Sequence, residues 1–408
     1  MFPLHKSGAL QLLQGGQEFF PALIKALDAA HTWIQLETYI FDFHGAGAEV
    51  AEALVRAARR GVTVQVLVDG IGTSPLPAQW REKFSAAKVD WFVYSPLGTG
   101  LSGLGLLMPE RWRRLHRKLC VVDQHTLFCG GINVLDDFYD PNHGELQAPR
   151  VDFAVTVTGP LALEAADAMA LLWWRVQAGY SARQRHIGAA WERFKAAGYG
   201  GRTGSTPLVD ARAAGASGPK AALILRDNLR NRASIERAYR RAIGKAHREI
   251  IIANAYFLPG GKLRRALTAA ARRGVRVTLL LQGRYEYFMQ YHAARPVYGA
   301  LLEAGVEIHE YEASFLHAKV AVVDGHWATV GSSNLDPLSL LLAREANVVV
   351  EDRAFAESLA GILRQAMVNY GRRVEPAAYG RRPWVQRLQG WTAYVLVRLA
   401  LLVARQRY

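Results

Sequence analysis

The sequence predicts an α/β fold of two pseudo-symmetric lobes, each an α/β/α sandwich with a mostly parallel sheet. Three observations lead to this prediction: an internal repeat, short apolar runs that follow helical segments, and a polar motif in each half. His31 corresponds to His247, and Arg-Arg-Gly-Val at 59–62 corresponds to the same residues at 272–275. A chain of 408 residues can form two or three domains, so each repeat can form a lobe.

The helices and strands follow the same order in both halves. Segments 53–61 and 266–274 have helical apolar spacing and end in two arginines and a glycine, as helices often do. The runs 62–69 and 275–282 are short, β-branched and uninterrupted, which is typical of strands buried on both faces. Helix followed by strand in each half predicts largely parallel sheets.

Composition divides the chain into four parts. Residues 181–220 are rich in Gly, Ala, Ser and Arg and are predicted to connect lobes at 1–180 and 221–375. Residues 376–408 fall outside the repeat. Apolar residues dominate there, arginines are spaced among them, and Trp391 suits an interface. This pattern predicts a basic amphipathic tail at a membrane interface. A core helix that closes the second lobe, or a contact between subunits, is the alternative.

The charge balance predicts a polyanionic partner. Lys and Arg number 50 against 35 Asp and Glu, a formal net charge of +15. This favours either nucleic acid or an anionic lipid surface. An apolar fraction of 50% excludes a mainly disordered chain. Every uncharged apolar stretch is either too short for a membrane-spanning helix or contains helix breakers. The two cysteines are too few for a disulfide framework.

Each half ends in the same group of polar residues. A histidine, a lysine two residues later and an aspartate five residues further on precede a small residue and an asparagine. The residues are His116, Lys118, Asp123, Gly131 and Asn133 in the first half, and His317, Lys319, Asp324, Ser332 and Asn334 in the second. Composition predicts about 0.01 chance matches to this motif, so two copies with equal spacing are significant.

The motif suits displacement at a phosphodiester without a metal. Histidine and lysine two apart on a strand share a face, so two copies supply two imidazoles and two ammonium groups. One neutral imidazole attacks phosphorus and forms a phosphohistidine, and the other donates a proton to the leaving alkoxide. The lysines offset charge on the phosphoryl oxygens. The residues expected to bind the substrate phosphate are Asn133, Asn334, Gly131 and Ser332.

Carboxylates are expected to hold each imidazole in the required tautomer. Asp123 and Asp324 fall where the motif strands end, while Asp152 and Glu345 begin the next apolar strand in each half. The sequence leaves both pairs open as candidates. No His, Cys or Asp cluster has the spacing of a metal site, so neither a metal nor another cofactor is expected.

The duplicated motif resembles the phospholipase D superfamily. Further stretches, such as 36–40, 254–260 and 326–340, resemble bacterial cardiolipin synthases, most closely the B subfamily, over roughly residues 9–375. The resemblance implies two lobes with the active site between them. It also implies transfer of a phosphatidyl group from phosphatidylglycerol or phosphatidylethanolamine to phosphatidylglycerol, with His116 as nucleophile, on the cytoplasmic side of the bacterial cell membrane.

A hydrolase or a nuclease with the same motifs is the alternative. The first half carries 16 more residues than the second before its motif, because strands 89–94 and 306–311 are 217 residues apart and the motifs 201. This insertion is expected to contact acyl chains or to form a buried flap. The contact residues are Leu104, Leu106, Leu107 and Trp112. The insertion and the tail favour anionic phospholipids and a membrane surface over nucleic acid.

Overall fold

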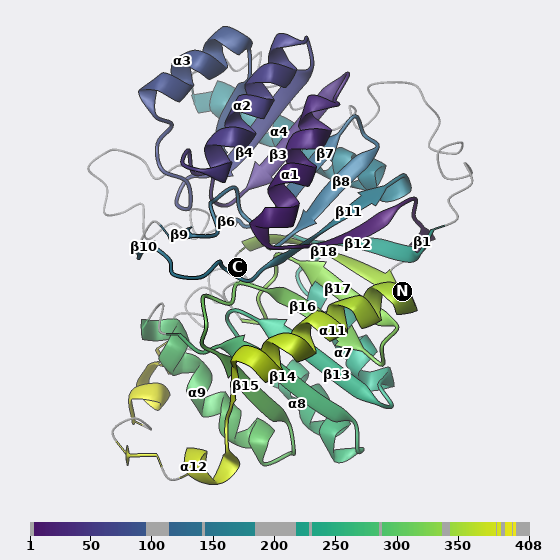
Figure 1. Cartoon of the computed structure of the whole chain (residues 1–408), viewed down its shortest axis with the longest axis vertical. Helices are drawn as coiled ribbons and strands as arrows, with labels where there is room; N and C mark the ends of the chain where they lie inside the picture. Colours follow the sequence, from purple (N-terminus) through teal and green to yellow (C-terminus); the bar gives the residue numbers. More distant parts are fainter. Residues whose placement is uncertain are drawn as a thin grey trace.

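Two β-sheets organise the chain into the two expected lobes, one above the other in Figure 1. The structure is a computed structural model. It describes residues 4–94, 114–140, 143–183, 218–227, 231–284, 288–336, 343–380, 382–384, 388–393 and 395–396. The predicted acyl contacts Leu104, Leu106, Leu107 and Trp112 lie outside these ranges, as does most of the predicted connector.

The first half of the chain builds most of the upper lobe. Its elements are β1 (His5–Lys6), β2 (Leu10–Gln14), α1 (Gly15–Asp28), β3 (Trp33–Thr38), α2 (Ala46–Arg59), β4 (Thr63–Asp69), α3 (Ala78–Ala87), β5 (Asp90–Tyr94), β6 (Arg114–Leu115), β7 (Lys118–Val122), β8 (Thr126–Gly130), β9 (Tyr139–Asp140), β10 (Gly144–Glu145), β11 (Phe153–Thr158) and α4 (Pro160–Arg183). The strand order of its sheet is β2-β11-β8-β7-β3-β4-β5.

The second half repeats this plan. Its elements are β12 (Lys220–Arg226), α7 (Ser234–Lys245), β13 (Glu249–Asn254), α8 (Gly261–Arg272), β14 (Arg276–Gln282), α9 (Phe288–Leu302), β15 (Glu307–Tyr311), β16 (Lys319–Val323), β17 (Trp327–Gly331), β18 (Ala343–Glu351), α11 (Arg353–Tyr370), β19 (Gly371–Arg373) and α12 (Pro376–Gly380). The main path through its sheet is β1-β12-β18-β17-β16-β13-β14-β15-β19.

Helices cover both faces of each sheet, which confirms the two predicted sandwiches. Helices α1 and α2 pack with one face of the first sheet, and α7, α8 and α9 pack with one face of the second. Between the lobes, α4, α11 and strands of both sheets share one buried apolar cluster. The lobes are therefore joined by a common core, which fixes the relative position of residues at their interface.

The expectation of mostly parallel sheets was wrong. Only β3-β4-β5 and β13-β14-β15 pair in parallel within the two main strand orders, and the remaining neighbours there are antiparallel. For the pairs β7-β8 and β16-β17, the cause is a tight turn after each motif strand. Between β7 and β8, Asp123 and Gln124 have φ of 50° and 55°, and His125 N–H donates to Val122 O at 3.0 Å. Such a turn joins antiparallel strands.

Two short strands of the first half cross to the second lobe. Strand β1 pairs with β12, and β6 pairs with β18. The lobes are thus interlocked, and the domain boundaries at 180 and 220 stay predictions. Within the described part of the chain, no helix combines the length and the apolar character needed to span a membrane.

Candidate active site

The two motif histidines are held at the interface by backbone hydrogen bonds that cross between the lobes. His116 immediately precedes β7, and its N–H donates to Arg344 O at 3.1 Å. His317 precedes β16, and its N–H donates to Val151 O at 2.8 Å. Each motif strand therefore starts on a main-chain contact with the opposite lobe, which is how the fold brings the two copies together.

A buried carboxylate from the opposite lobe holds each imidazole. His116 Nδ1 lies 3.0 Å from Glu345 Oε1, and His317 Nδ1 lies 2.6 Å from Asp152 Oδ2. The imidazoles are 16% and 17% exposed, while the carboxylates are 0% and 3% exposed. Because the carboxylates occupy Nδ1, the Nε2 atoms are the ones left to react. Of the two candidate pairs, Asp152 and Glu345 are thus in contact with the histidines.

The expectation that Asp123 and Asp324 belong to the catalytic group was wrong. Each lies on the turn at the far end of its motif strand, five residues beyond the start of a strand that rises about 3.3 Å per residue. The Asp123 carboxylate accepts hydrogen bonds from the N–H groups of His31, Thr32 and Trp33 at 2.8–2.9 Å. Asp324 makes the equivalent bonds to residues 247–249. These residues therefore tie the turn to the neighbouring strand.

Replacing Asp123 with Ala should lower stability without a direct effect on the reaction. Hydrogen bonds from the backbone, opposed by partial burial, lower the pKa of Asp123 from 3.8 to about 2. We expect a loss of about 1–2 kcal/mol in the free energy of unfolding. The difference should be full above pH 4 and shrink as the pH falls towards 2, because protonation removes it in the wild type. Urea unfolding checks this, and a kcat that falls a thousandfold in the folded variant would contradict it.

Two lysines place positive charge beside the histidines. Lys118 Nζ donates to His116 O at 2.7 Å, and Lys319 Nζ donates to His317 O. Burial lowers the pKa of Lys118 to about 7, opposed by Glu345. Burial also lowers the pKa of both histidines, and that of His317 falls well below its ordinary value. In the free site, burial therefore opposes positive charge on both imidazoles and on Lys118.

The pKa shifts predict a narrow pH optimum. Burial raises the pKa of Asp152 to about 6, so this carboxylate loses its charge as the pH falls below 6. Lys118 loses its proton as the pH rises above about 7. We therefore expect kcat/KM to peak between pH 6 and 7 and to fall on both sides. A profile measured with dispersed short-chain phosphatidylglycerol checks this. A rate that keeps rising through alkaline pH would contradict the assignment of Lys118.

Gly131 and Ser332 act on the carboxylates in this structure. A Cβ atom at Gly131 would lie 2.3 Å from Asp152 Oδ1, so only glycine leaves room for this carboxylate. At the corresponding place in the second lobe, Ser332 Oγ donates to Glu345 Oε2 at 2.5 Å. Both residues thus position the carboxylates that orient the histidines, and the expectation that they bind phosphate stays a prediction.

The two asparagines stay candidates for the substrate phosphate. Asn133 Oδ1 accepts a hydrogen bond from Ile40 N at 3.2 Å. The oxygen of this amide is thus engaged, and its Nδ2 is the atom that can donate to a phosphate oxygen. Asn334 is only 2% exposed, and its Oδ1 has no partner within the described residues. Among those residues, no group of three or more His, Cys, Asp or Glu side chains could hold a metal ion.

Sequence reasoning missed a buried ion pair beneath His116. Arg117, between the motif histidine and lysine, donates to Glu37 Oε1 at 2.9 Å, and both side chains are buried. The second lobe has Ala318 at the corresponding position, so the two copies differ here. The signal was an arginine directly before the apolar motif strand, because a buried arginine needs a buried acidic partner.

Comparison with known proteins shows the family of this chain. A family model described as "Cardiolipin synthase, PLD-like domain" matches residues 23–144 and 239–367. Cardiolipin synthase B of Salmonella typhi is 37% identical over 92% of this chain and 84% of its own length, and that of Escherichia coli K12 is 36% identical over the same shares. The fold matches a phosphatidylserine synthase of Haemophilus influenzae with a TM-score of 0.67 at 15% identity, over 98% and 97% of the two chains. The chain thus belongs to the cardiolipin synthase family of phospholipase D-like proteins.

Proposed function

We propose that this chain is a phosphatidyltransferase that makes cardiolipin. Phosphatidylglycerol is the acceptor, and the donor is a second phosphatidylglycerol or phosphatidylethanolamine. The observation that carries the proposal is the crossed pair of imidazoles, each on a carboxylate of the other lobe and beside a buried lysine. Relatives named cardiolipin synthase share more than a third of its residues over most of its length.

The reaction proceeds in two displacements at phosphorus. In the first, Nε2 of one histidine forms a bond to the phosphorus of the donor, and the bond from phosphorus to the headgroup oxygen breaks. The other histidine, protonated on Nε2, donates that proton to the leaving oxygen. In the second, the histidine that donated the proton takes the proton of the acceptor hydroxyl. The hydroxyl oxygen then bonds to phosphorus and displaces the nitrogen of the phosphohistidine. We assign the nucleophile to His116 and the acid/base role to His317, by analogy with the family.

The lysines and carboxylates have separate roles in this scheme. Lys118 and Lys319 offset the negative charge that spreads over the phosphoryl oxygens. Glu345 and Asp152 hold Nδ1 of the histidines and stabilise the imidazolium that forms in each step. Because both carboxylates are buried, they act on the imidazoles and do not touch the substrate.

The tail supports a lipid substrate. Trp384 and Trp391 are 73% and 59% exposed, and Leu388 between them is also exposed. These three large apolar side chains are exposed within eight positions of the tail, and we call them the apolar stripe. Ala393, by contrast, is buried in the core of the second lobe. We propose that the tail docks on this lobe and that the stripe lies in the interface of the bacterial cell membrane, on its cytoplasmic side.

Removing the two tryptophans should weaken membrane binding. For Trp384→Ser/Trp391→Ser, we expect at least ~10-fold weaker sedimentation with phosphatidylglycerol vesicles, since each buried aromatic side chain contributes about 1.5–3 kcal/mol. Leu171→Ser/Val368→Ser is the matched control, because these residues are exposed apolar residues elsewhere on the described surface. Equal binding by both variants would show that the stripe meets something other than a bilayer.

Product analysis tests the proposed function. Purified protein is incubated in chelator with mixed phosphatidylglycerol and phosphatidylethanolamine vesicles, and the products are identified by mass spectrometry beside a His116→Ala control. Cardiolipin from the wild type alone supports the proposal, and released glycerol or ethanolamine identifies the donor. Phosphatidic acid alone would mean a hydrolase. Unchanged lipids together with cleavage of added DNA would mean a nuclease.

A further inference from the structure

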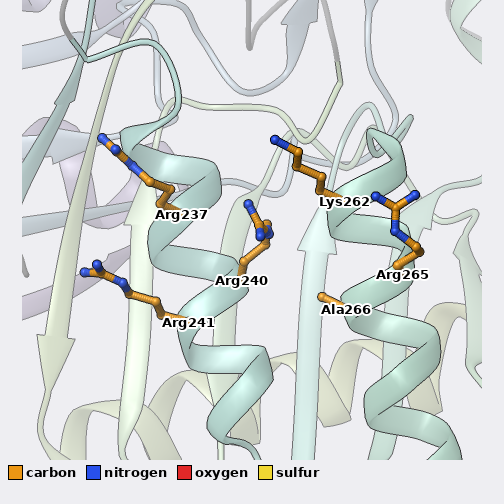
Figure 2. Close-up of a pocket in the computed structure, with 6 residues that line it drawn as sticks. All are labelled: Arg237, Arg240, Arg241, Lys262, Arg265 and Ala266. Carbon is orange, nitrogen blue, oxygen red and sulfur yellow. The ribbon is translucent and has the colours of Figure 1, made fainter.

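Helices α7 and α8 enclose a hollow that is lined almost entirely by positive charge. The hollow measures about 520 Å³. Figure 2 shows Arg240 of α7 and Lys262 of α8 extending into the space between the two helices, with the other cations on the same two helices around it. Its lining residues, which we call the basic groove, are Arg237, Arg240, Arg241, Lys262, Arg265 and Ala266. Ala266 is the uncharged member of this set.

These charges lack acidic neighbours that would neutralise them. Glu236 is the one acidic residue in the sequences of α7 and α8, against four arginines and lysines in each helix. No ion pair is found for the five cations of the basic groove among the described residues. Elsewhere on the surface, arginines such as Arg56 and Arg364 form ion pairs with a carboxylate. Self-repulsion of this kind costs free energy, which an anionic ligand would relieve.

The basic groove belongs to the layer of helices that also holds the tail. Ile235 of α7, Leu263 of α8, Val297 of α9 and Ala393 of the tail all pack into one apolar cluster over the second sheet. The exposed apolar stripe of the tail and the basic groove are thus parts of the same outer layer. A surface that combines interfacial tryptophans with clustered arginines is typical of proteins that lie on an anionic bilayer.

The basic groove also lies towards the catalytic end of the lobe. Lys262 is in the first turn of α8, which follows the end of β13 at Asn254. Asn254 is the register partner of the motif lysine Lys319. Since α7 leads into β13 from the opposite direction, the first turns of α7 are at this end too. A lipid held at the groove would therefore lie at the edge of the lobe that carries the active site.

We infer that the basic groove binds the phosphate headgroups of anionic phospholipids and so docks the second lobe on the membrane. The inference rests on the proposed function, because it takes the membrane as the source of substrate. Planar guanidinium groups bind phosphate oxygens in pairs, and several around one hollow suit a phosphodiester. A single-stranded nucleic acid would need aromatic side chains for base stacking, and none lines the groove.

A charge-removal experiment on vesicles tests the inference. The full-length variant Arg240→Gln/Arg265→Gln removes one cation from each wall of the groove. The control Lys25→Gln/Arg59→Gln removes two exposed cations from the first lobe. Sedimentation is measured with vesicles of phosphatidylglycerol and phosphatidylcholine, and with phosphatidylcholine alone. We expect about tenfold weaker binding of the groove variant to the anionic vesicles and an unchanged control. The charge-conserving Arg240→Lys/Arg265→Lys should retain most binding.

Each other outcome has a defined meaning. Equal binding by the groove variant and the wild type would overturn the inference. The inference would also be overturned if the groove variant lost DNA binding in gel retardation but kept vesicle binding. The groove would then be a nucleic-acid surface. Turnover of dispersed short-chain phosphatidylglycerol should be the same in wild type and groove variant. If the wild type makes no cardiolipin but its vesicle binding depends on the groove, the proposed function fails and the groove assignment stands.

Discussion

With a phosphatidyl ester of p-nitrophenol as donor, a His317→Ala variant should accumulate a covalent phosphatidyl-enzyme, whereas a His116→Ala variant should form none. Nitrophenolate leaves without a proton from the enzyme, so the first displacement no longer needs the acid. The second displacement still needs a base to take the proton of the acceptor hydroxyl. A variant that keeps the nucleophile but lacks the base therefore stops at the phosphohistidine.

Intact-protein mass spectrometry and the burst of nitrophenolate measure this accumulation. With phosphatidylglycerol as donor, both single variants should lose at least ~10³-fold in kcat, and the double variant should be little worse, since the two residues act as a unit. Accumulation in His116→Ala instead would reverse the two roles. Accumulation in neither variant, with turnover retained, would rule out a covalent intermediate on histidine. This order cannot be derived from the motifs, because both copies have the histidine, lysine, aspartate and asparagine at the same spacing.

The sequence predicted the repeat unit of the fold well because each element has its own local signal. The predicted strand at 62–69 is observed as β4, Thr63–Asp69, and the one at 275–282 as β14, Arg276–Gln282. The antiparallel pairing that follows each motif was missed, although Asp324-Gly325 is a strong signal for a hairpin turn. The helix–strand pattern predicts the parallel strands β3, β4 and β5 correctly, but it does not apply to β7 and β8, which a short turn makes antiparallel.

The crossed contacts of the site could not be predicted from the sequence. Asp152 and Glu345 stand in equivalent places after the two motifs, and nothing local tells whether a carboxylate binds the histidine of its own half. That choice depends on how the lobes pack, which is fixed by the shared core of α4, α11 and both sheets. Asp123 and Asp324 were misassigned for a related reason. They belong to the motif in sequence, but a strand length separates them from the lysines.

Glu345→Gln should slow the first displacement, whereas Asp152→Asn should slow the second. A neutral amide still occupies Nδ1 of the histidine but no longer stabilises the positive charge that the imidazole acquires. Glu345 binds His116, so its replacement should lower the nitrophenolate burst rate, by roughly 10²–10⁴-fold if it matches other acid–base partners. Asp152 binds His317, so its replacement should leave the burst nearly intact and lower the steady-state rate.

The matched control for Glu345→Gln is Ser332→Ala, which removes the hydroxyl that donates to Glu345 but keeps the carboxylate charge. We expect a loss of about tenfold or less there, corresponding to one neutral hydrogen-bond donor. Glu345→Gln should also move the alkaline limb of the pH profile to lower pH, because Glu345 is the strongest influence that opposes the burial of Lys118 and keeps it protonated. Burst rates that fall equally in Glu345→Gln and Asp152→Asn would refute the separation of roles. An alkaline limb that stays in place would show that the charge on Lys118 does not depend on the carboxylate of the other lobe.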